Sequence, residues 1–233
     1  MGSPPSRARP ADRRRRERLS RPHRPLGRHP VPSAVSGPLL RVEGLVAGYG
    51  RPVVGPVSFD VAPGEVVGLW GANGCGKSTL LNAIADRADR LAGRILRMPG
   101  LLIAYQAQQP VRLPSMPVTG HELLRFAGAS LHDMPTAIQS VLRRRIDRLS
   151  GGQYQLLCVW AAIAGRADLI LLDEPTNNLD PAREALLIEM LTPSRLARRD
   201  ASGAQPRADR GVLVVSHERR FLEDACSRMI EIP

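Results

Sequence analysis

The segment "GANGCGKST", Gly71 to Thr79, has the composition and spacing of a phosphate-binding loop. It satisfies the pattern G-x-x-x-x-G-K-S between an apolar stretch and a helix-like stretch. Glycines let backbone N–H groups converge on phosphate oxygens at the start of a helix. The loop therefore predicts a site for ATP and Mg²⁺, in which Ser78 supplies a metal ligand. We expect every position of the loop to contact nucleotide: Gly71, Ala72, Asn73, Gly74, Cys75, Gly76, Lys77, Ser78 and Thr79.

Lys77 is the only lysine of the chain, because the other 32 of its 33 basic residues are arginine. An ammonium group on a flexible stem fits between the β- and γ-phosphates, whereas a guanidinium group is planar and suited to bidentate contacts. The composition therefore indicates that this position needs the shape of lysine as well as its charge. The neighbouring Cys75 is either a small residue at a variable loop position or a reactive thiol in an electropositive loop.

Two adjacent carboxylates, Asp173 and Glu174, follow the apolar run "LILL". An apolar run without alternation predicts a strand that is buried on both faces of a parallel sheet. At the carboxyl edge of such a sheet, Asp173 can reach Mg²⁺ through a bound water. Glu174 projects in another direction and can polarise the water that attacks the γ-phosphate. The pair predicts hydrolysis of ATP, with Lys77 as a further catalytic residue.

A longer stretch, "LSGGQYQLLCVWAAIAGRADLILLDEPTNNLD", begins at Leu149. Together with the glycine loop, it resembles the ATP-binding-cassette (ABC) ATPases over residues 39–233. The serine and glycines of "LSGGQ" open a helix, so their N–H groups form a second surface that faces phosphate. The resemblance implies that this surface meets ATP bound to an opposite subunit, in a homodimer or a pseudo-dimer. The residues expected to form this second contact are Ser150, Gly151, Gly152, Gln153 and, at the end of the D-loop, Asp180.

The resemblance assigns three more residues. His217 matches the switch histidine that contacts the γ-phosphate, and Tyr49 matches the aromatic residue that stacks on adenine. In the Q-loop "YQAQQP", the family's usual proline is missing, and Gln106, Gln108 and Gln109 are all present. Alignment of "IAYQAQ" with the family pattern selects Gln108 as the Mg²⁺ and lid glutamine. The predicted Mg²⁺ ligands are therefore Ser78, Gln108 and Asp173.

The predicted fold is α/β: a P-loop NTPase core with a mixed or parallel sheet, an N-terminal antiparallel β subdomain and a helical signature subdomain. Residues 39–233 form the nucleotide-binding domain, with the helical part at about 110–165. We expect strands at 39–49, 57–61 and 65–71, two more within 93–106 that are broken at Pro99 and Gly100, then 167–175 and, last in the core, 212–218. Helices are expected at 80–88, within 119–147 and from Pro181, and a surface loop at 193–211.

The formal charge of +11 lies mainly in residues 1–38, which hold ten arginines, two acidic residues and eight prolines. With almost no large apolar residue, this segment is predicted to be disordered. It is either a solvated tail or upstream sequence translated from a start codon placed too early, or it binds anionic lipid or RNA. The nearly neutral remainder argues against nucleic acid as a partner. Three widely spaced cysteines suggest neither zinc nor disulfides, and thus a reducing cytoplasm.

The leading hypothesis is the ATPase subunit of an importer. The resemblance implies a separate transmembrane permease, an extracytoplasmic substrate-binding protein and a place on the inner face of the cell membrane. The stretch "GRILRMPGLLIAYQAQQPVRLPSMPVTGHELLRF" looks most like the zinc, manganese and iron-chelate subgroup. The alternative is a soluble ABC protein that acts on ribosomes or nucleic acid, for which the basic tail and "EPTNNLD" are the arguments. A single cassette disfavours that alternative.

Overall fold

The computed structural model describes residues 37–108, 117–199, 206–207 and 209–232, and only the backbone of 198–199 and 206–207. All of them belong to one compact unit, Val35–Pro233. The disorder predicted for residues 1–38 therefore falls almost entirely outside the described residues. No helix in the described part is long and apolar enough to cross a membrane.

A three-stranded antiparallel sheet has the order β2-β1-β4. Its strands are β1 (Leu40–Gly48), β2 (Pro52–Val61) and β4 (Asp89–Arg97). Alternate side chains of β1 are buried with the apolar residues of helix α2 (Lys77–Ile84). Each such buried leucine or isoleucine contributes about 1.5–3 kcal/mol, so this contact fixes the helix that follows the glycine loop.

The second sheet has five parallel strands in the order β10-β3-β9-β6-β5. In β6 and β9 every residue is buried, as expected for central strands. Leu169 and Leu171 face the apolar cluster that contains α2, whereas Ile170 and Leu172 face the cluster on the opposite side. The strands are β3 (Val66–Trp70), β5 (Ile103–Gln106), β6 (Leu169–Asp173), β9 (Gly211–Val215) and β10 (Arg228–Glu231).

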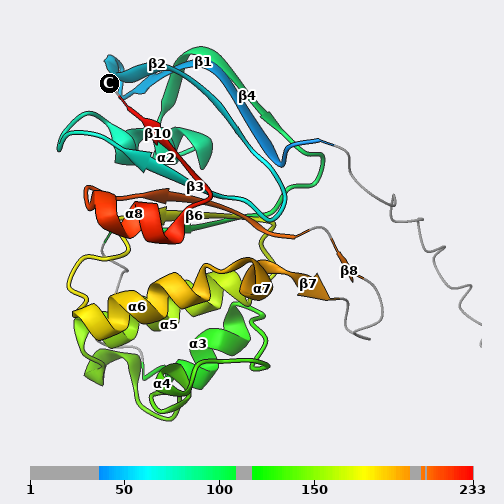
Figure 1. Ribbon diagram of the computed structural model, residues 1–233, viewed down its shortest axis with the longest axis vertical. Helices are drawn as coiled ribbons and strands as arrows, with labels where there is room; N and C mark the ends of the chain where they lie inside the picture. Colours follow the sequence, from blue (N-terminus) through cyan, green and yellow to red (C-terminus); the bar gives the residue numbers. More distant parts are fainter. Residues whose placement is uncertain (1–36, 109–116, 200–205, 208, 233) are drawn as a thin grey trace, which may run out of the picture. The chain divides into compact units, whose positions relative to one another are not determined.

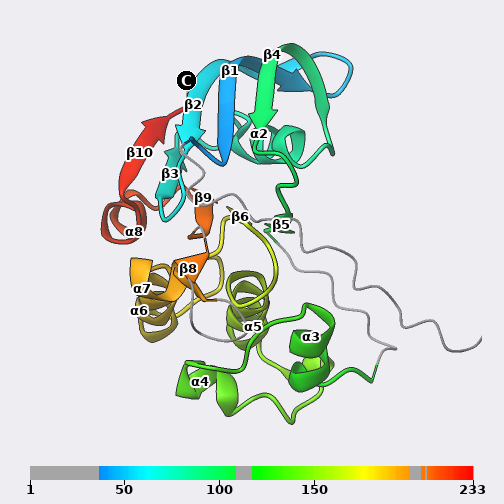
Figure 2. The ribbon, with the colours of Figure 1, turned by 90° about the vertical axis from the view of Figure 1, so that its right-hand side faces the viewer.

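The helices divide between the two faces of the parallel sheet. Figures 1 and 2 show α2 between the two sheets, and α5 and α6 on the other side of the parallel sheet. The chain from β5 to β6 is mostly helical, and Thr119 and Glu122 form the capping box that starts its first helix. The remaining helices are α3 (Gly120–Phe126), α4 (Thr136–Gln139), a 3₁₀ turn (Ile146–Arg148), α5 (Gly151–Ile163), α6 (Pro181–Met190), α7 (Pro193–Leu196) and α8 (Arg219–Ala225).

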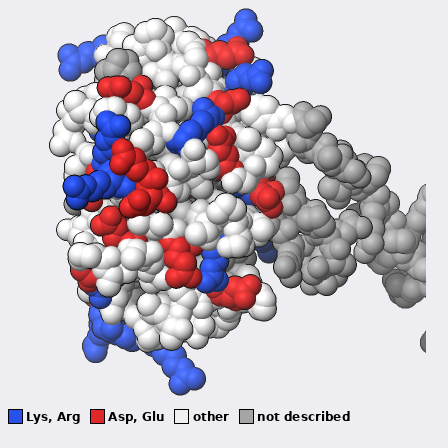
Figure 3. Space-filling view, viewed as in Figure 1, with Lys and Arg blue, Asp and Glu red and all other residues white. Residues whose placement is uncertain are grey.

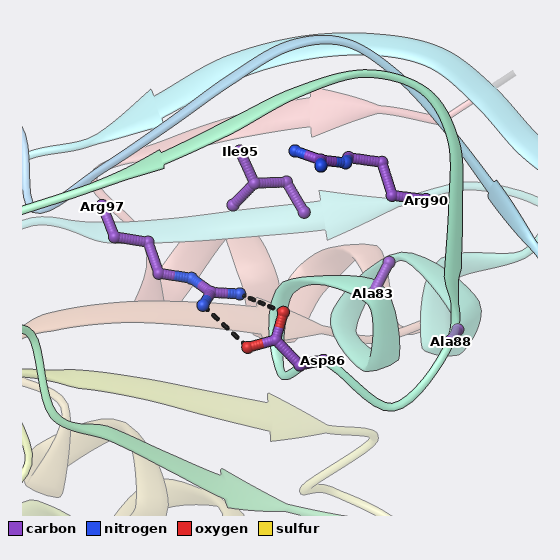
Figure 4. Close-up of a pocket in the computed structure, with 6 residues that line it drawn as sticks. All are labelled: Ala83, Asp86, Ala88, Arg90, Ile95 and Arg97. Atoms are coloured by element: carbon purple, nitrogen blue, oxygen red, sulfur yellow. Dashed lines mark hydrogen bonds and ion pairs between the residues drawn. The ribbon is translucent and has the colours of Figure 1, made fainter.

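An ion pair ties the end of α2 to β4 (Figure 4). The Nη1 and Nη2 atoms of Arg97 donate to the two carboxylate oxygens of Asp86 at 2.7 and 2.8 Å, and Nη2 also donates to the carbonyl of Ile84. These bonds satisfy a carbonyl near the helix end and hold the pKa of Asp86 below its ordinary value. The pair also forms one wall of a cleft of about 410 Å³. These bonds therefore hold the C-terminal end of α2, the helix that follows the glycine loop, against β4.

The mixed α/β architecture with one antiparallel and one parallel sheet confirms the predicted fold class. Three element predictions were wrong. The core does not end with the strand after Gly211, because β10 follows and pairs with β3. The stretch 193–211 is not a plain loop, since it contains α7 and the short pair β7 (Arg198–Arg199) and β8 (Pro206–Arg207). Strand β2 begins at Pro52 rather than at residue 57, because β-bulges absorb its glycine and proline residues.

Candidate nucleotide-binding and hydrolysis site

The glycine loop joins the end of β3 to α2 through a left-handed turn at Gly76. The φ of Gly76 is +94°, and a Cβ there would lie 2.6 Å from Cβ of Val54 on the neighbouring strand. Only glycine satisfies both restrictions. Within the described part of the chain, no side chain caps the N-terminus of α2. Its first N–H groups thus remain available to an anion, which the positive end of the helix favours.

Lys77 is the first residue of α2 and is only 6% exposed. Its Nζ donates to the carbonyl oxygens of Gly71 and Ala72 at 2.8 and 3.0 Å. The lysine therefore folds back over the loop that it follows. Its charge lies inside the loop, where phosphate oxygens would compete for the same hydrogens.

Asp173, at the end of β6, is 4% exposed and accepts two side-chain hydrogen bonds. The Oγ of Ser78 donates to its Oδ1 at 2.8 Å, and the hydroxyl of Tyr105 donates to its Oδ2 at 3.1 Å. Burial raises the pKa of Asp173, although the two hydrogen bonds oppose the rise. Burial and the Asp173 carboxylate also raise the pKa of Tyr105, so its hydroxyl is protonated and donates. A cation beside Asp173 would relieve the cost of this buried charge.

Glu174 follows directly and has a left-handed backbone, with φ +48°, which is uncommon for a residue other than glycine. Its side chain turns to the end of β9, where its Oε2 lies 2.8 Å from Nδ1 of His217 and 3.3 Å from the backbone N of the same residue. The structure thus brings the predicted base and the predicted switch histidine into direct contact. Such strained backbone is typical of functional turns.

A cavity of about 300 Å³ lies over the start of α2. Residues from four separate parts of the chain line it, which is the arrangement that the motifs predict. Gln108 is among them, whereas Gln106 is 7% exposed and its buried amide has no hydrogen-bond partner within the described residues. Gln109 lies outside the described residues. The lining residues are Val53, Asn73, Gly74, Gly76, Lys77, Ser78, Thr79, Gln108 and Glu174.

Tyr49 lies beside α2 at the end of β1 and is 56% exposed. Its hydroxyl accepts a hydrogen bond from Nδ2 of Asn82 on α2 at 3.3 Å. Cys75 is partly exposed, and its Sγ packs closely against Gly71. The exposed ring of Tyr49 leaves a face for stacking, but its role with adenine stays a prediction.

The signature residues, Ser150, Gly151, Gly152 and Gln153, stand at the N-terminus of α5, on the other side of the parallel sheet from α2, and are not among those that line the cavity (Figure 1). The Oγ of Ser150 accepts from N of Gln153, whose Oε1 accepts from N of Ser150, which forms a capping box. A Cβ on Gly152 would meet the side chain of Arg183 at 2.9 Å. Within this one subunit, the structure therefore does not bring the signature and the glycine loop into one site.

Asp180 begins the helix next to the signature. Its Oδ1 accepts from N of Arg183 at 2.9 Å as the N-cap of α6, and its Oδ2 forms an ion pair with the side chain of Arg183. This arrangement is sufficient to explain an aspartate before Pro181 structurally. Its coupling role remains a prediction.

The donor set at and beside the cavity fits Mg²⁺. The carboxylate of Asp173, the hydroxyl of Ser78 and the amide oxygen of Gln108 are hard oxygen ligands, which this cation prefers. Among the described residues, no group of three or more histidine, cysteine or acidic side chains could hold a metal ion.

A glycine loop that opens a helix beside a buried parallel strand, with carboxylates at that strand's end, defines a P-loop nucleoside triphosphatase. The family profile described as "ABC transporter" matches residues 54–177. The chain belongs to the ABC transporter family. It is the ATP-binding subunit of a transporter of this family and is an ATPase. Members of this kind work with a membrane permease.

Two curated relatives carry the same name, zinc import ATP-binding protein ZnuC. The protein of Roseobacter denitrificans is 34% identical over 199 residues, which cover 82% of this chain and 74% of that protein. The protein of Marinobacter nauticus is 28% identical over 202 residues, with 84% and 75% covered. The predicted resemblance to ABC ATPases of the metal-import subgroup is confirmed.

Solved structures give the same fold. A metal-chelate type ABC transporter in an inward-facing conformation is 23% identical, with a TM-score of 0.65 and 84% of this chain and 80% of that chain covered. An ATP-binding subunit of an ABC transporter is 25% identical, with a TM-score of 0.65 and coverage of 83% and 85%. The expected P-loop NTPase core is thereby confirmed.

The motifs missed the residues that support the site. Tyr105 bonds Asp173, Asn82 bonds Tyr49, and Nη1 of Arg144 donates to Oε1 of Gln153 at 3.3 Å. For Tyr105 a signal existed, since it stands near the carboxyl end of a strand that precedes the Q-loop. Nothing in the local sequence marks the other two contacts.

Proposed function

We propose that the chain hydrolyses ATP in the cavity over α2 and thereby drives the import of zinc through a separate membrane permease. The observation that carries the site is that Lys77, Ser78, Gln108 and Glu174 line one cavity. The observation that favours zinc is that relatives of up to 34% identity, aligned over 82% of this chain, are named zinc import proteins.

Each residue has a chemical task in this proposal. Backbone N–H groups of the loop and the Lys77 ammonium hold the phosphates, and Thr79 supports them from the first turn of α2. Ser78, Gln108 and Asp173 hold Mg²⁺, which supplies positive charge to the phosphate oxygens when bound. Glu174 polarises the attacking water, and Nδ1 of His217 fixes the orientation of that carboxylate.

The signature would act on a second nucleotide. The capping box starts α5 at Ser150, and none of the signature residues lines the cavity over the glycine loop of the same subunit. We infer that they meet ATP bound to another copy or homologue, and that Asp180 lies at that contact. Two ATP molecules are then enclosed between two subunits.

The metal would not pass through this chain. The described residues contain no cluster that could hold zinc. We therefore place zinc recognition in the permease and in an extracytoplasmic binding protein, and this ATPase on the inner, cytoplasmic face of the membrane. The start of the nucleotide-binding domain at residue 39 and its helical part at about 110–165 stay predictions, and so does the predicted disorder of residues 1–38.

A pull-down with Glu174→Gln tests the transporter role. This variant is expected to retain ATP and to stay on its partner, because hydrolysis no longer separates the subunits. We expect detergent extracts to yield an ATP-dependent complex with one membrane protein. The Lys77→Ala, Glu174→Gln double variant is the matched control, since it lacks the phosphate contact. Recovery of ribosomes without a membrane protein would instead support the soluble alternative.

Growth under metal limitation tests the cargo. Cells without this gene are expected to stop growing in a chelator and to recover with added zinc, but not with manganese or iron. A wild-type copy should restore growth, whereas Glu174→Gln should not. Rescue of the deletion by manganese or iron alone would refute zinc as the cargo while leaving the ATPase intact.

A further inference from the structure

The carboxylate of Asp173 is held on both oxygens by side chains from different elements. Ser78 comes from α2 and bonds Oδ1, whereas Tyr105 comes from β5 and bonds Oδ2. An aspartate carboxylate otherwise rotates over a broad range about its last torsion angle. Two donors on opposite oxygens restrict that rotation.

The register of the sheet explains how Tyr105 reaches this carboxylate. In the parallel pair β5 and β6, Tyr105 lies level with Leu171. Asp173 is two residues further along β6, on the same face, and thus lies about 6.6 Å further on in the strand direction at 3.3 Å per residue. A tyrosine side chain spans that length. A shorter polar residue in this position would not reach Asp173.

The ring of Tyr105 has support of its own. The guanidinium carbon of Arg87 lies 4.6 Å from the ring centroid, in the geometry of a cation–π contact. Tyr105 also packs against the apolar cluster around α2. These contacts depend on the ring and not on the hydroxyl, so phenylalanine would keep them. The hydroxyl can therefore be tested separately from the packing.

We propose that Tyr105 is a positioning residue for the metal-binding carboxylate. It holds Oδ2 of Asp173 and so leaves Oδ1, the oxygen beside Ser78, for Mg²⁺ and its bound water. This inference rests on the proposed role of Asp173 in holding Mg²⁺. Tyr105 acts through Asp173 and touches neither nucleotide nor metal.

Metal affinity tests the inference directly. With a non-hydrolysable ATP analogue bound, free Mn²⁺ is measured by electron paramagnetic resonance as a probe of the Mg²⁺ site. We expect Tyr105→Phe to raise the Mn²⁺ dissociation constant about 5- to 10-fold, which corresponds to the net value of a typical hydrogen bond. The Mg²⁺ concentration for half-maximal hydrolysis should rise in parallel. Affinity for ATP in EDTA should not change, because the phosphate contacts remain.

Three further variants separate the possible outcomes. Incorporation of 3-fluorotyrosine at position 105 keeps the hydroxyl and should restore the wild-type Mn²⁺ affinity. Tyr154→Phe, which changes a tyrosine of α5, should leave that affinity unaltered. In the Asp173→Asn background, Tyr105→Phe should have no further effect, because the acceptor charge is already absent.

The pattern of losses distinguishes this inference from the proposed metal site. If Asp173→Asn leaves Mn²⁺ affinity unchanged, the proposed metal site itself is wrong. If Asp173→Asn weakens Mn²⁺ binding and Tyr105→Phe does not, only the role of Tyr105 is overturned. An equal loss of ATP affinity in EDTA for Tyr105→Phe would show a structural effect and would also refute positioning.

Discussion

The Nδ1 atom of His217 lies 2.8 Å from Oε2 of Glu174, although 43 residues separate the two in the chain. They meet because β6 and β9 are parallel neighbours, with Asp173 level with Val215, so the residues after each strand emerge at the same edge. The left-handed backbone of Glu174 turns its side chain toward that neighbour. The predicted base of the reaction is therefore in contact with a residue that follows another strand, β9.

Replacement of Glu174 by glutamine should abolish most hydrolysis without loss of ATP binding. Glutamine keeps the size of the side chain but cannot accept a proton from water. We expect phosphate release to fall about 10²- to 10⁴-fold, as for the loss of a general base. Binding of a fluorescent ATP analogue should be unchanged. As a comparison, His217→Ala should reduce turnover less, because the carboxylate remains. A Glu174→Gln protein with more than about a tenth of wild-type turnover would contradict the assignment.

Two glycines of the loop should differ in their tolerance of alanine. Gly74 and Gly76 both have positive φ, which costs an alanine about 1–2 kcal/mol. A Cβ on Gly74 meets nothing within 4 Å, whereas one on Gly76 meets Val54 at 2.6 Å. Gly76→Ala should therefore lower the free energy of unfolding by about 1–3 kcal/mol more than Gly74→Ala. Urea denaturation of the nucleotide-free protein measures the difference. Equal losses would show that the contact with Val54 relaxes freely.

The features predicted best from the sequence are those that depend on residues close together in the chain. The glycine loop requires glycine at Gly76 for both its φ and its contact with β2, and the run before Asp173 is apolar because β6 is buried on both faces. Such requirements produce a pattern that can be recognised within a short stretch of sequence. The fold class and the cavity positions followed from these patterns and from the resemblance to a family.

Contacts between distant residues left no such pattern. The short strand β10 contains arginine and glutamate and is stabilised by its pairing with β3, so its own composition did not indicate a strand. The place of Tyr105 near the end of β5 was a signal for the site, but its bond to Asp173 depends on the register between β5 and β6, which no single segment encodes. Alignment with the family pattern selected Gln108, whereas the burial of Gln106 depends on the packing of the sheet.

Asp173→Asn should stabilise the nucleotide-free protein at neutral pH. Burial raises the pKa of this carboxyl above its ordinary value of 3.8, so the folded state binds the proton more tightly than the unfolded state. Stability is therefore lost as the pH rises from 3.8 through the folded pKa, and the full loss persists at pH 7. Asparagine removes that loss. Thermal unfolding without Mg²⁺ or ATP should show a higher midpoint for the variant at pH 7, with a gain that shrinks on acidification toward pH 4. A gain that is independent of pH, or no gain at pH 7, would contradict the role of burial.

Lys77→Arg should disable the enzyme although it keeps the charge. The Nζ atom of Lys77 fits between the carbonyl oxygens of Gly71 and Ala72, and the side chain is 6% exposed. A guanidinium group is wider and planar, so it cannot occupy this space without displacing the loop. We expect ATP hydrolysis to fall at least about 10²-fold, comparable to the loss of one charge-stabilising contact. Arg94→Lys, the reverse exchange on the exposed strand β4, should leave turnover unchanged. Full turnover of Lys77→Arg would show that charge alone suffices and that the single lysine of this arginine-rich chain has another cause.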